Sequence, residues 1–499
     1  MNICLVSAQI SNPIKSKDEK FQSDFVYMCI DNAYTAAYLE QLGYSVDVIE
    51  GELESKKEVM KKIVTNNYQV VGISINYSNY IESIRLINAI SKKMPKMFIF
   101  ACGYYATLKY QELINDVESL DCCIIGEQEI TIANLVGNIN NKNLWINIPG
   151  LAYKQNGECI RTEKVRLIEN LDILPFPKRP YQTSDMAEII SARGCYGDCS
   201  FCSSNDMTKE AIGPRVRLRS PKNVVDEMKH LADMYHVTYF NFANDNFMNF
   251  KEENWLSDFV AEIKSHNLQN IKFSIFARAN DVIRNRNQLM ILHDAGLDYI
   301  FVGVESFIDR QLKLYNKGNT SEINLKALDI LRSENIKYVC GFIPLDPFVV
   351  IDELKYNFYT LIKIGFQSHA HFMQVPISCL EPLYAGEGSK LFEVYKTQNV
   401  VDANNIYRFE FAHEEIIQFN KALKPWRQKI FMLNKKVIKL LQASDITLER
   451  KKILLALKSQ IILLDLRAML YLCDDIVENG INEVQTSFYD EIVELETAI

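Results

Sequence analysis

The sequence lacks three features that would place it in other classes of protein. It has no excess of basic residues, because 55 Lys and Arg are outweighed by 63 Asp and Glu, giving a net charge of −8. Nine of its twelve cysteines are scattered with no framework spacing, and its most apolar stretch, Ile453–Leu472, is interrupted by Lys458, Asp465 and Arg467. These absences argue against a broad nucleic-acid surface, a disulfide-stapled secreted fold and a membrane span.

The sequence also shows no signal-peptide pattern at its first residues and has no histidine before His230. The amino-terminal residues Met-Asn-Ile-Cys-Leu-Val-Ser are typical of a strand and lack the charged-then-apolar pattern of a signal peptide. Together with the scattered cysteines, this predicts a reducing, cytoplasmic setting. All seven histidines lie at or beyond His230, so the preceding residues offer no imidazole to a metal. At 48% hydrophobic and 24% charged, the 499 residues suffice for about three globular domains.

Three cysteines, Cys195, Cys199 and Cys202, stand close together directly after an apolar strand. A [4Fe–4S] cluster normally takes four thiolates, so three on one loop, with no fourth nearby, would leave one iron open to another ligand. Three buried free thiols and a zinc site are the alternatives, although zinc would need a fourth Cys or His at its own spacing. The sequence favours an iron–sulfur cluster.

The same loop resembles that of the radical S-adenosylmethionine (SAM) superfamily, which has this CxxxCxxC spacing and an aromatic residue, here Phe201, before the last cysteine. The resemblance implies that Cys195, Cys199 and Cys202 hold the cluster and that the open iron binds the amino and carboxylate groups of SAM. It also implies that one electron from the cluster cleaves SAM to a 5′-deoxyadenosyl radical, with Phe201 against the adenine.

Strand and helix patterns alternate from Ile189 to about Pro382 and predict a partial (β/α)6 barrel. Helices are expected at Pro221–Tyr235, with Ser220 as N-cap, at Glu253–His266 and at Ile351–Ile364. The six expected strands are Ile189–Ala192, Tyr239–Ala243, Phe273–Phe276, Tyr299–Val304, Tyr338–Ile343 and His369–Met373.

Polar residues follow several of these strands, where barrel active sites lie. The resemblance assigns Asp245 to the SAM amino group, Arg278 to the SAM carboxylate, and Glu305 of the GxES motif, with Ser306 nearby, to the ribose. Each of these residues alone is equally typical of a solvated loop or a turn cap.

Other positions depart from the family or carry a weaker signal. Asn244 stands where an acid is commoner in the family, and Leu345-Asp-Pro347 replaces a Gly-Thr-like turn, so the resemblance assigns no substrate contact there. Arg217 and Arg219 precede the helix that starts at Pro221, and we expect them to form structural ion pairs rather than an anion site.

The first 145 residues alternate five strands with helices, which predicts a doubly wound parallel sheet of the Rossmann or flavodoxin-like type. Ligands of such sheets bind beyond the carboxyl ends of the strands. The loops expected there are Gln9–Phe25, Ser74–Ser78, Gly103–Thr107 and Gly126–Glu129. The expected strands are Asn2–Ser7, Ser45–Glu50, Gln69–Ser74, Met97–Ala101 and Asp121–Ile125.

This pattern resembles the cobalamin-binding domain that precedes many radical SAM domains. The resemblance makes Ser74, Gly103, Thr107, Gly126 and Glu127 candidate cobalamin contacts. Because the domain has no histidine, the lower face of cobalt would be left to water, another side chain or nothing. A flavodoxin-like domain with a different ligand, or with none, is the alternative.

Four parts are therefore expected along the chain. They are a cobalamin-binding domain (1–145), a hairpin and proline-rich linker (146–187), a radical SAM partial barrel (188–385) and an all-helical region (386–499). The linker part holds the hairpin Gly150–Val165 and the proline-rich run Leu171–Pro180. The helical region is expected at Glu414–Ala443 and Leu448–Glu478, the latter being buried or partner-facing rather than membrane-spanning.

As a whole, the resemblance implies a cobalamin-dependent radical SAM enzyme, most simply a class B-like methyltransferase acting on an unactivated carbon of a small molecule. Its cofactors would be a [4Fe–4S] cluster, SAM and cobalamin, and its partner a reductant such as flavodoxin or ferredoxin. Neither nucleic acid nor membrane is expected as a partner, while a peptide substrate stays open. Ring contraction or oxidative cyclisation without methyl transfer, and a non-enzymatic sensor, are the alternatives.

Overall fold

The structure is a computed structural model that describes residues 1–10, 29–248, 254–383, 385–386, 389–401, 409–443, 446–480 and 483–499. The chain packs as two compact units, each treated by itself below. The first holds residues 1–196 and 202–238, and the second holds residues 197–201 and 239–499. Most of the expected loop Gln9–Phe25 lies outside the described residues.

The first unit is built on a seven-stranded sheet in the order β2-β1-β3-β4-β5-β6-β7, of which the first five strands are parallel. This confirms the five strands expected from the alternating pattern and gives the doubly wound order, whose topological switch lies between β1 and β3. The strands are β1 (Asn2–Ser7), β2 (Ser45–Glu50), β3 (Val70–Ser74), β4 (Phe98–Cys102), β5 (Cys122–Ile124), β6 (Leu151–Gln155) and β7 (Glu158–Arg161).

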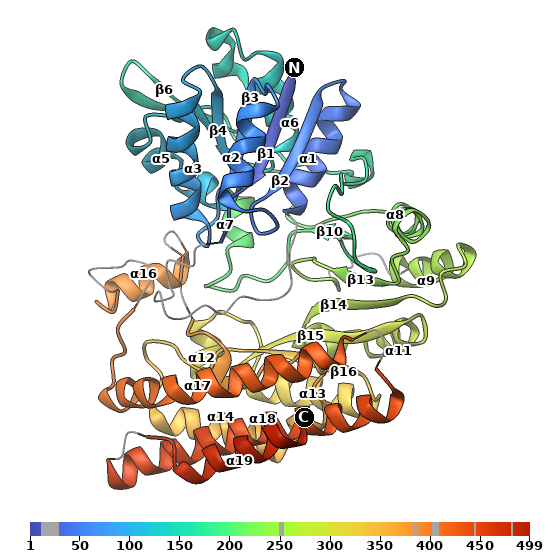
Figure 1. Cartoon of the computed structure of the whole chain (residues 1–499), viewed down its shortest axis with the longest axis vertical. Helices are drawn as coiled ribbons and strands as arrows, with labels where there is room; N and C mark the ends of the chain where they lie inside the picture. Colours follow the sequence, from blue (N-terminus) through green and yellow to red (C-terminus); the bar gives the residue numbers. More distant parts are fainter. Residues whose placement is uncertain are drawn as a thin grey trace. The chain divides into compact units, whose positions relative to one another are not determined.

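Helices cover this sheet, as expected for parallel strands buried on both faces. Contacts pair α1 with α6 and α2 with α3, and Figure 1 shows α2 and α3 side by side along the sheet. A capping box between Ser55 and Glu58 fixes the start of α2. The helices are α1 (Ile30–Gln41), α2 (Lys56–Thr65), α3 (Tyr80–Lys93), α4 (Gly103–Leu108), α5 (Tyr110–Asp116), α6 (Glu129–Gly137) and the 3₁₀ helix η1 (Lys142–Asn147).

The expected hairpin forms, with its turn at Asn156 and Gly157, and it extends the first sheet. Strand β6 pairs antiparallel with β5, so the hairpin is part of the sheet and not of a spacer. The proline-rich run that follows is also packed. Leu171 and Leu174 lie in an apolar cluster with Tyr34 of α1, and the amide of Lys178 donates to the carbonyl of Ala33 over 3.1 Å.

Short elements complete the first unit. Strand β10 pairs with β12, and β8 pairs with β11. Ser220 caps α8 by accepting from the amide of Asn223 over 3.2 Å, and Pro221 occupies the first helical position, as predicted. The elements are β8 (Val165–Arg166), η2 (Leu171–Ile173), β9 (Met186–Ile189), β10 (Ala192–Arg193), α7 (Ser204–Lys209), β11 (Ala211–Ile212), β12 (Arg217–Leu218) and α8 (Pro221–Tyr235).

The second unit contains the parallel run β13-β14-β15-β16, at the positions predicted for four barrel strands. Helices follow the strands in alternation, which confirms the βα pattern. The strands are β13 (Tyr239–Phe242), β14 (Lys272–Arg278), β15 (Leu297–Glu305) and β16 (Lys337–Phe342). The helices are α9 (Trp255–Ser265), α10 (Ala279–Arg284), α11 (Arg286–Asp294), α12 (Asp309–Leu314), α13 (Ser321–Ser333), α14 (Ile351–Lys363) and α15 (Phe366–His369).

The sixth expected strand, His369–Met373, is reduced to a single bridge. Helix α15 runs to His369, and Ala370 then bridges β16 at Tyr338. The backbone continues beside β16 without a ladder, since the side chain of Gln374 accepts from the amide of Cys340 over 2.7 Å. A side chain therefore satisfies a β16 amide that a regular sixth strand would have bonded with its backbone.

Charged side chains of the helical region bind this irregular segment from the other side. Lys458 donates to the carbonyl of Gln374, and Arg427 Nε donates to the carbonyl of Ser378 over 2.6 Å. The amide of Ser378 donates to Asp465 over 3.0 Å. Because buried backbone groups need partners, these three charges hold the segment without a strand.

The helical region ends the chain with α16 (Lys390–Thr397), α17 (Glu414–Leu441), α18 (Leu448–Asn479) and α19 (Thr486–Ala498), after the short 3₁₀ helix η3 (Ile377–Cys379). Figure 1 shows α17, α18 and α19 as neighbouring long helices, and contacts join α18 to α14, α17 and α19. Lys458 and Asp465, which interrupt the apolar run, are both buried. No helix in the described part of the chain is long and apolar enough to span a membrane.

Candidate functional site

The three-cysteine loop joins β10 to α7. Gly194, just before Cys195, has a φ of 83°, and a Cβ there would lie 2.0 Å from the carbonyl oxygen of Arg215. Only glycine fits this turn, so the local backbone fixes where the loop begins. Cys195 is buried, Cys199 and Cys202 are partly exposed, and none of the three forms a disulfide bond.

Among the described residues, no group of three His, Cys, Asp or Glu side chains is arranged as a metal site. The loop supplies three thiols at the sequence spacing of a cluster site.

Arg278 contacts this loop from the end of β14. Its Nη1 donates to the sulfur of Cys199 over 3.2 Å, and its Nη2 donates to the carbonyl of Lys317. The side chain is 8% exposed. The resemblance assigned Arg278 to the SAM carboxylate, and the structure places the same guanidinium on a cysteine sulfur, where an N–H donor stabilises a thiolate.

Glu305 ends β15 in a conformation that is rare for a side-chain-bearing residue. Its φ is 65°, and a register shift separates Gly303 from Glu305 in the pairing with β16. The carboxylate lies 2.6 Å from Lys317 Nζ, with both residues less than a tenth exposed. Lys317 was not predicted from the sequence, yet it pairs with Glu305 through its side chain and with Arg278 through its carbonyl.

The side chain of Ser306 is not exposed to solvent. Its hydroxyl donates to Gln311 over 2.6 Å and accepts from the amide of Ile308 over 3.0 Å, and the residue is fully buried. Gln311 in turn donates to Asp346, which also accepts from Tyr315 over 2.7 Å. The GxES serine therefore belongs to a buried polar network beneath the site, and the structure assigns it a supporting place.

The remaining candidates of the second unit, Asp245 and Phe201, lie in different environments. Asp245 is exposed after β13, while Asn246 beside it is buried and donates to Asp281 over 2.9 Å. Phe201 meets the ring of Tyr315 edge-on at 6.0 Å and packs against an apolar cluster that includes Phe392. Asp245 is therefore an exposed carboxylate, and Phe201 is partly occupied by packing.

Four of the five candidate residues of the first unit form one connected set at the carboxyl ends of β3, β4 and β5. A Cβ on Gly103, whose φ is 88°, would lie 3.0 Å from Ser74 Oγ. Thr107 donates to the carbonyl of Gly103 over 2.9 Å and accepts from the amide of Gly126 over 3.1 Å. Ser74 ends β3 beside the topological switch, and Cys29 Sγ lies 3.5 Å from its hydroxyl. Ligands of doubly wound sheets bind at this edge.

Glu127 belongs to a different arrangement. Arg193 and Arg217 form ion pairs with its carboxylate, and the amide of Ile168 donates to it over 3.2 Å. Burial alone would raise the pKa of Glu127, but the two guanidinium groups outweigh it and hold this pKa below its ordinary value. The structure thus places Glu127 in a structural ion-pair cluster.

The two arginines before α8 are structural, as predicted. Arg217 pairs with Glu127 over 2.6 Å, and Arg219 pairs with Glu227 over 2.5 Å. All of these groups are buried or nearly so, and a buried ion pair leaves no free guanidinium for an anion.

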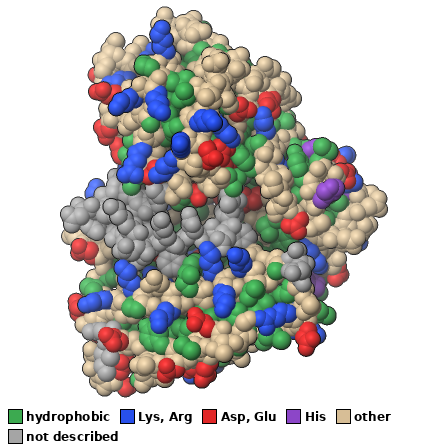
Figure 2. Space-filling model, viewed as in Figure 1, with side chains coloured by type: hydrophobic (Ala, Val, Ile, Leu, Met, Phe, Trp, Pro, Cys, Tyr) green, Lys and Arg blue, Asp and Glu red, His purple; other side chains and the backbone are tan. Residues whose placement is uncertain are grey.

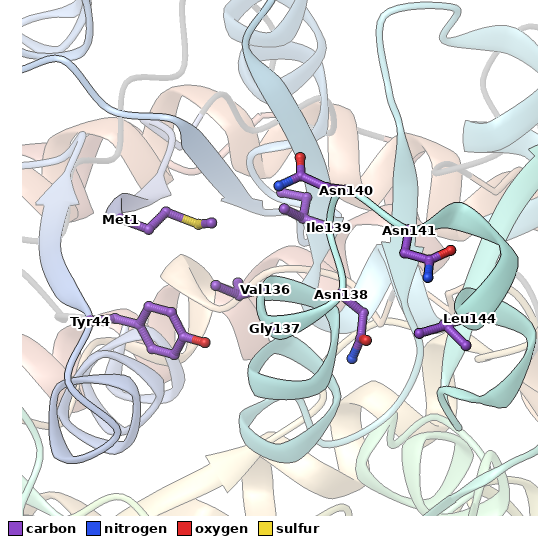
Figure 3. Close-up of a pocket in the computed structure, with 9 residues that line it drawn as sticks. All are labelled: Met1, Tyr44, Val136, Gly137, Asn138, Ile139, Asn140, Asn141 and Leu144. Carbon is purple, nitrogen blue, oxygen red and sulfur yellow. The ribbon is translucent and has the colours of Figure 1, made fainter.

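A cavity of about 340 Å³ lies elsewhere in the first unit. Figure 3 shows Met1 and Tyr44 on one side of it and Asn138, Asn141 and Leu144 on the other. Met1 and Tyr44 precede β1 and β2, so this cavity is at the amino ends of the strands. It lies opposite the edge where a doubly wound sheet binds its ligand.

Two protein families match the chain. The radical SAM superfamily matches residues 189–356, and the B12 binding domain matches residues 30–136. This chain contains a radical SAM domain and a B12 binding domain. The family matches imply a [4Fe–4S] cluster, SAM and cobalamin as its cofactors.

Relatives of known name resemble it at low identity. It is 27% identical over 328 residues to an anaerobic magnesium-protoporphyrin IX monomethyl ester cyclase of Rubrivivax gelatinosus, covering 62% of this chain and 58% of the relative. It is 24% identical over 425 residues to an uncharacterized methyltransferase of Pyrococcus horikoshii, covering 82% of this chain and 88% of the relative. The chain therefore spans about three fifths of the cyclase.

A solved structure shares the fold. The cobalamin-dependent S-adenosylmethionine radical enzyme OxsB with bound aqua-cobalamin superposes with a TM-score of 0.77 at 16% identity, covering all of this chain and 78% of OxsB. The likeness extends through the helical region as well as both family matches, so the whole chain has this architecture.

The residues present fit these cofactors to different degrees. The cysteine loop offers three thiols with an N–H donor already on one sulfur, which suits a cluster whose thiolates need stabilisation. The edge formed by Ser74, Gly103, Thr107 and Gly126 offers hydroxyl groups and close backbone at a ligand-binding position. Neither site uses histidine, since the described first unit up to His230 has none.

Proposed function

We propose that this protein is a cobalamin-dependent radical SAM methyltransferase acting on an unactivated carbon of a small molecule. The observation that carries the proposal is the presence on one chain of two complementary sites. One is the thiol loop with Arg278 on Cys199, and the other is the histidine-free edge from Ser74 to Gly126. When bound, the cluster with SAM supplies a 5′-deoxyadenosyl radical, and cobalamin supplies a methyl group.

The named residues have distinct roles under this proposal. Cys195, Cys199 and Cys202 hold the cluster and leave one iron for SAM. Arg278 donates to Cys199, so it tunes the cluster through a sulfur. Glu305, fixed by Lys317, presents a carboxylate to the ribose hydroxyls, and exposed Asp245 accepts from the amino group of SAM.

We prefer methyl transfer to ring formation because this chain covers more of the length of a methyltransferase relative than of a cyclase relative. The chain spans 88% of the Pyrococcus methyltransferase, compared with 58% of the Rubrivivax cyclase. A second candidate, radical ring formation or rearrangement without methyl transfer, is supported by the name of the cyclase and by its 27% identity. Both candidates use the same cofactors and differ in the product.

One assay separates the candidates. The protein is reconstituted without oxygen with iron, sulfide and cobalamin, and supplied with SAM, a reductant and extracts fractionated by size. Methyl transfer predicts 5′-deoxyadenosine and S-adenosylhomocysteine in step with one another. Formation of 5′-deoxyadenosine without S-adenosylhomocysteine would support ring formation. The absence of both products would support a sensor.

The matched variants are Cys199→Ala and Ser74→Leu. Cys199→Ala should remove deoxyadenosine formation altogether, because the cluster loses a ligand. Ser74→Leu should leave deoxyadenosine but reduce S-adenosylhomocysteine, because only the sheet edge is changed. Equal loss of both products in Ser74→Leu would contradict the assignment of two separate sites.

A further inference from the structure

One surface of the helical region is strongly basic, although the chain as a whole is acidic. Residues 416–444 contain six lysines and one arginine and no Asp or Glu, while the whole chain has 63 acids in 499 residues. At that average density, about three or four acids would fall in this stretch, so their absence concentrates positive charge on the part of α17 that follows Glu414 and Glu415. Five of these six lysines are exposed, and they are Lys421, Lys424, Lys429, Lys436 and Lys439.

Large aliphatic side chains are exposed among the lysines. Leu448 is 72% exposed and Met432 is 60% exposed, and Leu440, Ile453 and Leu455 are each more than a third exposed. On a helix, residues three or four apart share a face. Met432 and Leu440 therefore flank Lys436, and Leu448 and Leu455 flank Lys451 and Lys452.

These residues meet at one end of a helical hairpin. Lys458 of α18 contacts Asn434 of α17, and Trp426 of α17 donates to Asp465 of α18 over 2.9 Å, so the two helices run antiparallel. The end of α17 thus lies beside the start of α18. We call this surface the basic hairpin end, and it consists of Lys436, Lys439, Leu440, Leu448, Lys451, Lys452, Ile453 and Leu455.

The lysines of this surface form no ion pair with an acid among the described residues. Ion pairs between described residues do not involve Lys436, Lys439, Lys451 or Lys452, and Glu449 is the one acid of the described hairpin between residues 416 and 464. Figure 2 shows blue and green side chains interleaved over α17 on the face in view. The surface offers mobile positive charge and apolar area together.

We propose that the basic hairpin end docks on an anionic lipid bilayer surface. Lysines attract the negative surface potential of a bilayer, and exposed aliphatic side chains enter the headgroup boundary. A protein partner is less favoured by the composition, because protein interfaces are enriched in aromatic residues and arginine and depleted in lysine. Base stacking needs exposed aromatics, which this surface does not contain.

The docking is peripheral, and this revises the sequence-based expectation of no membrane partner. That expectation rested on the lack of a spanning helix, which the described residues confirm. The apolar face of α17 is already packed, with Trp426, Ile430, Leu433 and Val437 buried, so α17 cannot lie embedded in the lipid. Contact is therefore confined to the exposed lysines and the aliphatic side chains between them. This inference is independent of the reaction that the protein catalyses.

The test is co-sedimentation of the full-length protein with vesicles of phosphatidylcholine alone or containing about a third phosphatidylglycerol. We expect binding to the anionic vesicles only, and weaker binding at 0.5 M than at 0.1 M salt, because salt screens surface charge. Each lysine contributes about fivefold to partitioning. The variant Lys436→Glu/Lys439→Glu/Lys451→Glu/Lys452→Glu should therefore lose binding by about 100-fold or more.

A control variant carries the same change of charge on exposed lysines of the first unit, Lys57→Glu/Lys61→Glu/Lys92→Glu/Lys96→Glu. It should bind the vesicles within a fewfold of the parent protein. A second variant, Leu448→Ser/Ile453→Ser, should lose about tenfold at both salt concentrations, because burial of apolar area is insensitive to screening. Thermal melting of each variant checks that the fold is intact.

Three outcomes would overturn the proposal. The first is no binding of the parent protein to anionic vesicles. The second is equal loss in the control variant, which would mean that net charge alone matters. The third is capture of an acidic protein, such as flavodoxin, through the same lysines without vesicle binding, which would assign the surface to a protein partner.

Discussion

Arg278 Nη1 lies 3.2 Å from the sulfur of Cys199, and the same guanidinium is anchored through Nη2 on the carbonyl of Lys317. Lys317 in turn holds Glu305 over 2.6 Å. A cysteine of the proposed cluster, a guanidinium and a carboxylate are thus joined through one lysine. A substitution at any of these four residues should therefore alter the environment of the other three.

Replacing Arg278 tests the link to the cluster. We expect Arg278→Gln to keep iron and sulfide but to make the cluster harder to reduce, because an N–H donor to a cluster sulfur raises its potential. SAM cleavage should fall by about 10- to 100-fold, as is usual when an outer partner of a metal ligand is removed. Redox titration followed by electron paramagnetic resonance measures the potential. A potential equal to that of the parent protein would contradict the role.

Removing Lys317 should expose the cost of a buried charge. In Lys317→Met, Glu305 stays buried without its partner, and we expect a loss of about 3–5 kcal/mol in the free energy of unfolding. The double variant Glu305→Gln/Lys317→Met should recover part of that loss, because no unpaired charge remains. Urea denaturation measures both. Equal free energies of unfolding for the single and double variants would show that the Glu305–Lys317 ion pair does not account for the loss.

Glu50 gives the first unit a defined pH dependence. Burial raises its pKa to about 7, although the amide of Cys29 donates to it over 2.9 Å. The folded state then holds a proton between pH 4.5 and 7 that the unfolded state has lost, so stability falls as pH rises through this window.

Glu50→Gln should flatten this profile and be more stable than the parent protein at pH 8, by up to about 3 kcal/mol. Unfolding by urea at pH 5, 6, 7 and 8 measures the slope. Glu158→Gln, at the exposed first position of β7, is the control and should not alter the slope. A parent protein equally stable at pH 5 and pH 8 would contradict the prediction.

Lys458 should act in the opposite direction and at higher pH. Burial lowers its pKa to about 7, so between pH 7 and its ordinary value the folded state holds fewer protons than the unfolded state. Stability should therefore rise with pH across this window. Lys458→Met should lose the rise, and Lys451→Met, on the exposed face, should keep it. A rise that persists in Lys458→Met would assign it to another group.

Much of the fold could be predicted because its elements carry local signals. The strands Asn2–Ser7 and Ser45–Glu50 and the helix Pro221–Tyr235 have the bounds that periodicity and capping predict. The sixth barrel strand could not be predicted correctly, because its fate depends on charges about 50 to 90 residues away. Arg427, Lys458 and Asp465 bind the backbone of Gln374 and Ser378, directly after the expected strand, and no local pattern reveals that.

The residues of the candidate site were also predictable from the sequence only in part. Cys199, Arg278 and Glu305 were found from motifs and strand ends, and the structure brings Arg278 onto Cys199. Lys317 was missed, because it stands in a loop where only the following Gly318 marks a turn. Glu127 was assigned to cobalamin from its loop position, whereas tertiary contacts with Arg193 and Arg217 account for its carboxylate in the structure.

The central claim is that Cys195, Cys199 and Cys202 hold a [4Fe–4S] cluster. Its most direct test is chemical analysis of iron and acid-labile sulfide in protein purified without oxygen, alongside Cys199→Ala. The account predicts about four iron and four sulfide per chain, and neither in the variant. Zinc in place of iron, or iron without sulfide, would contradict it.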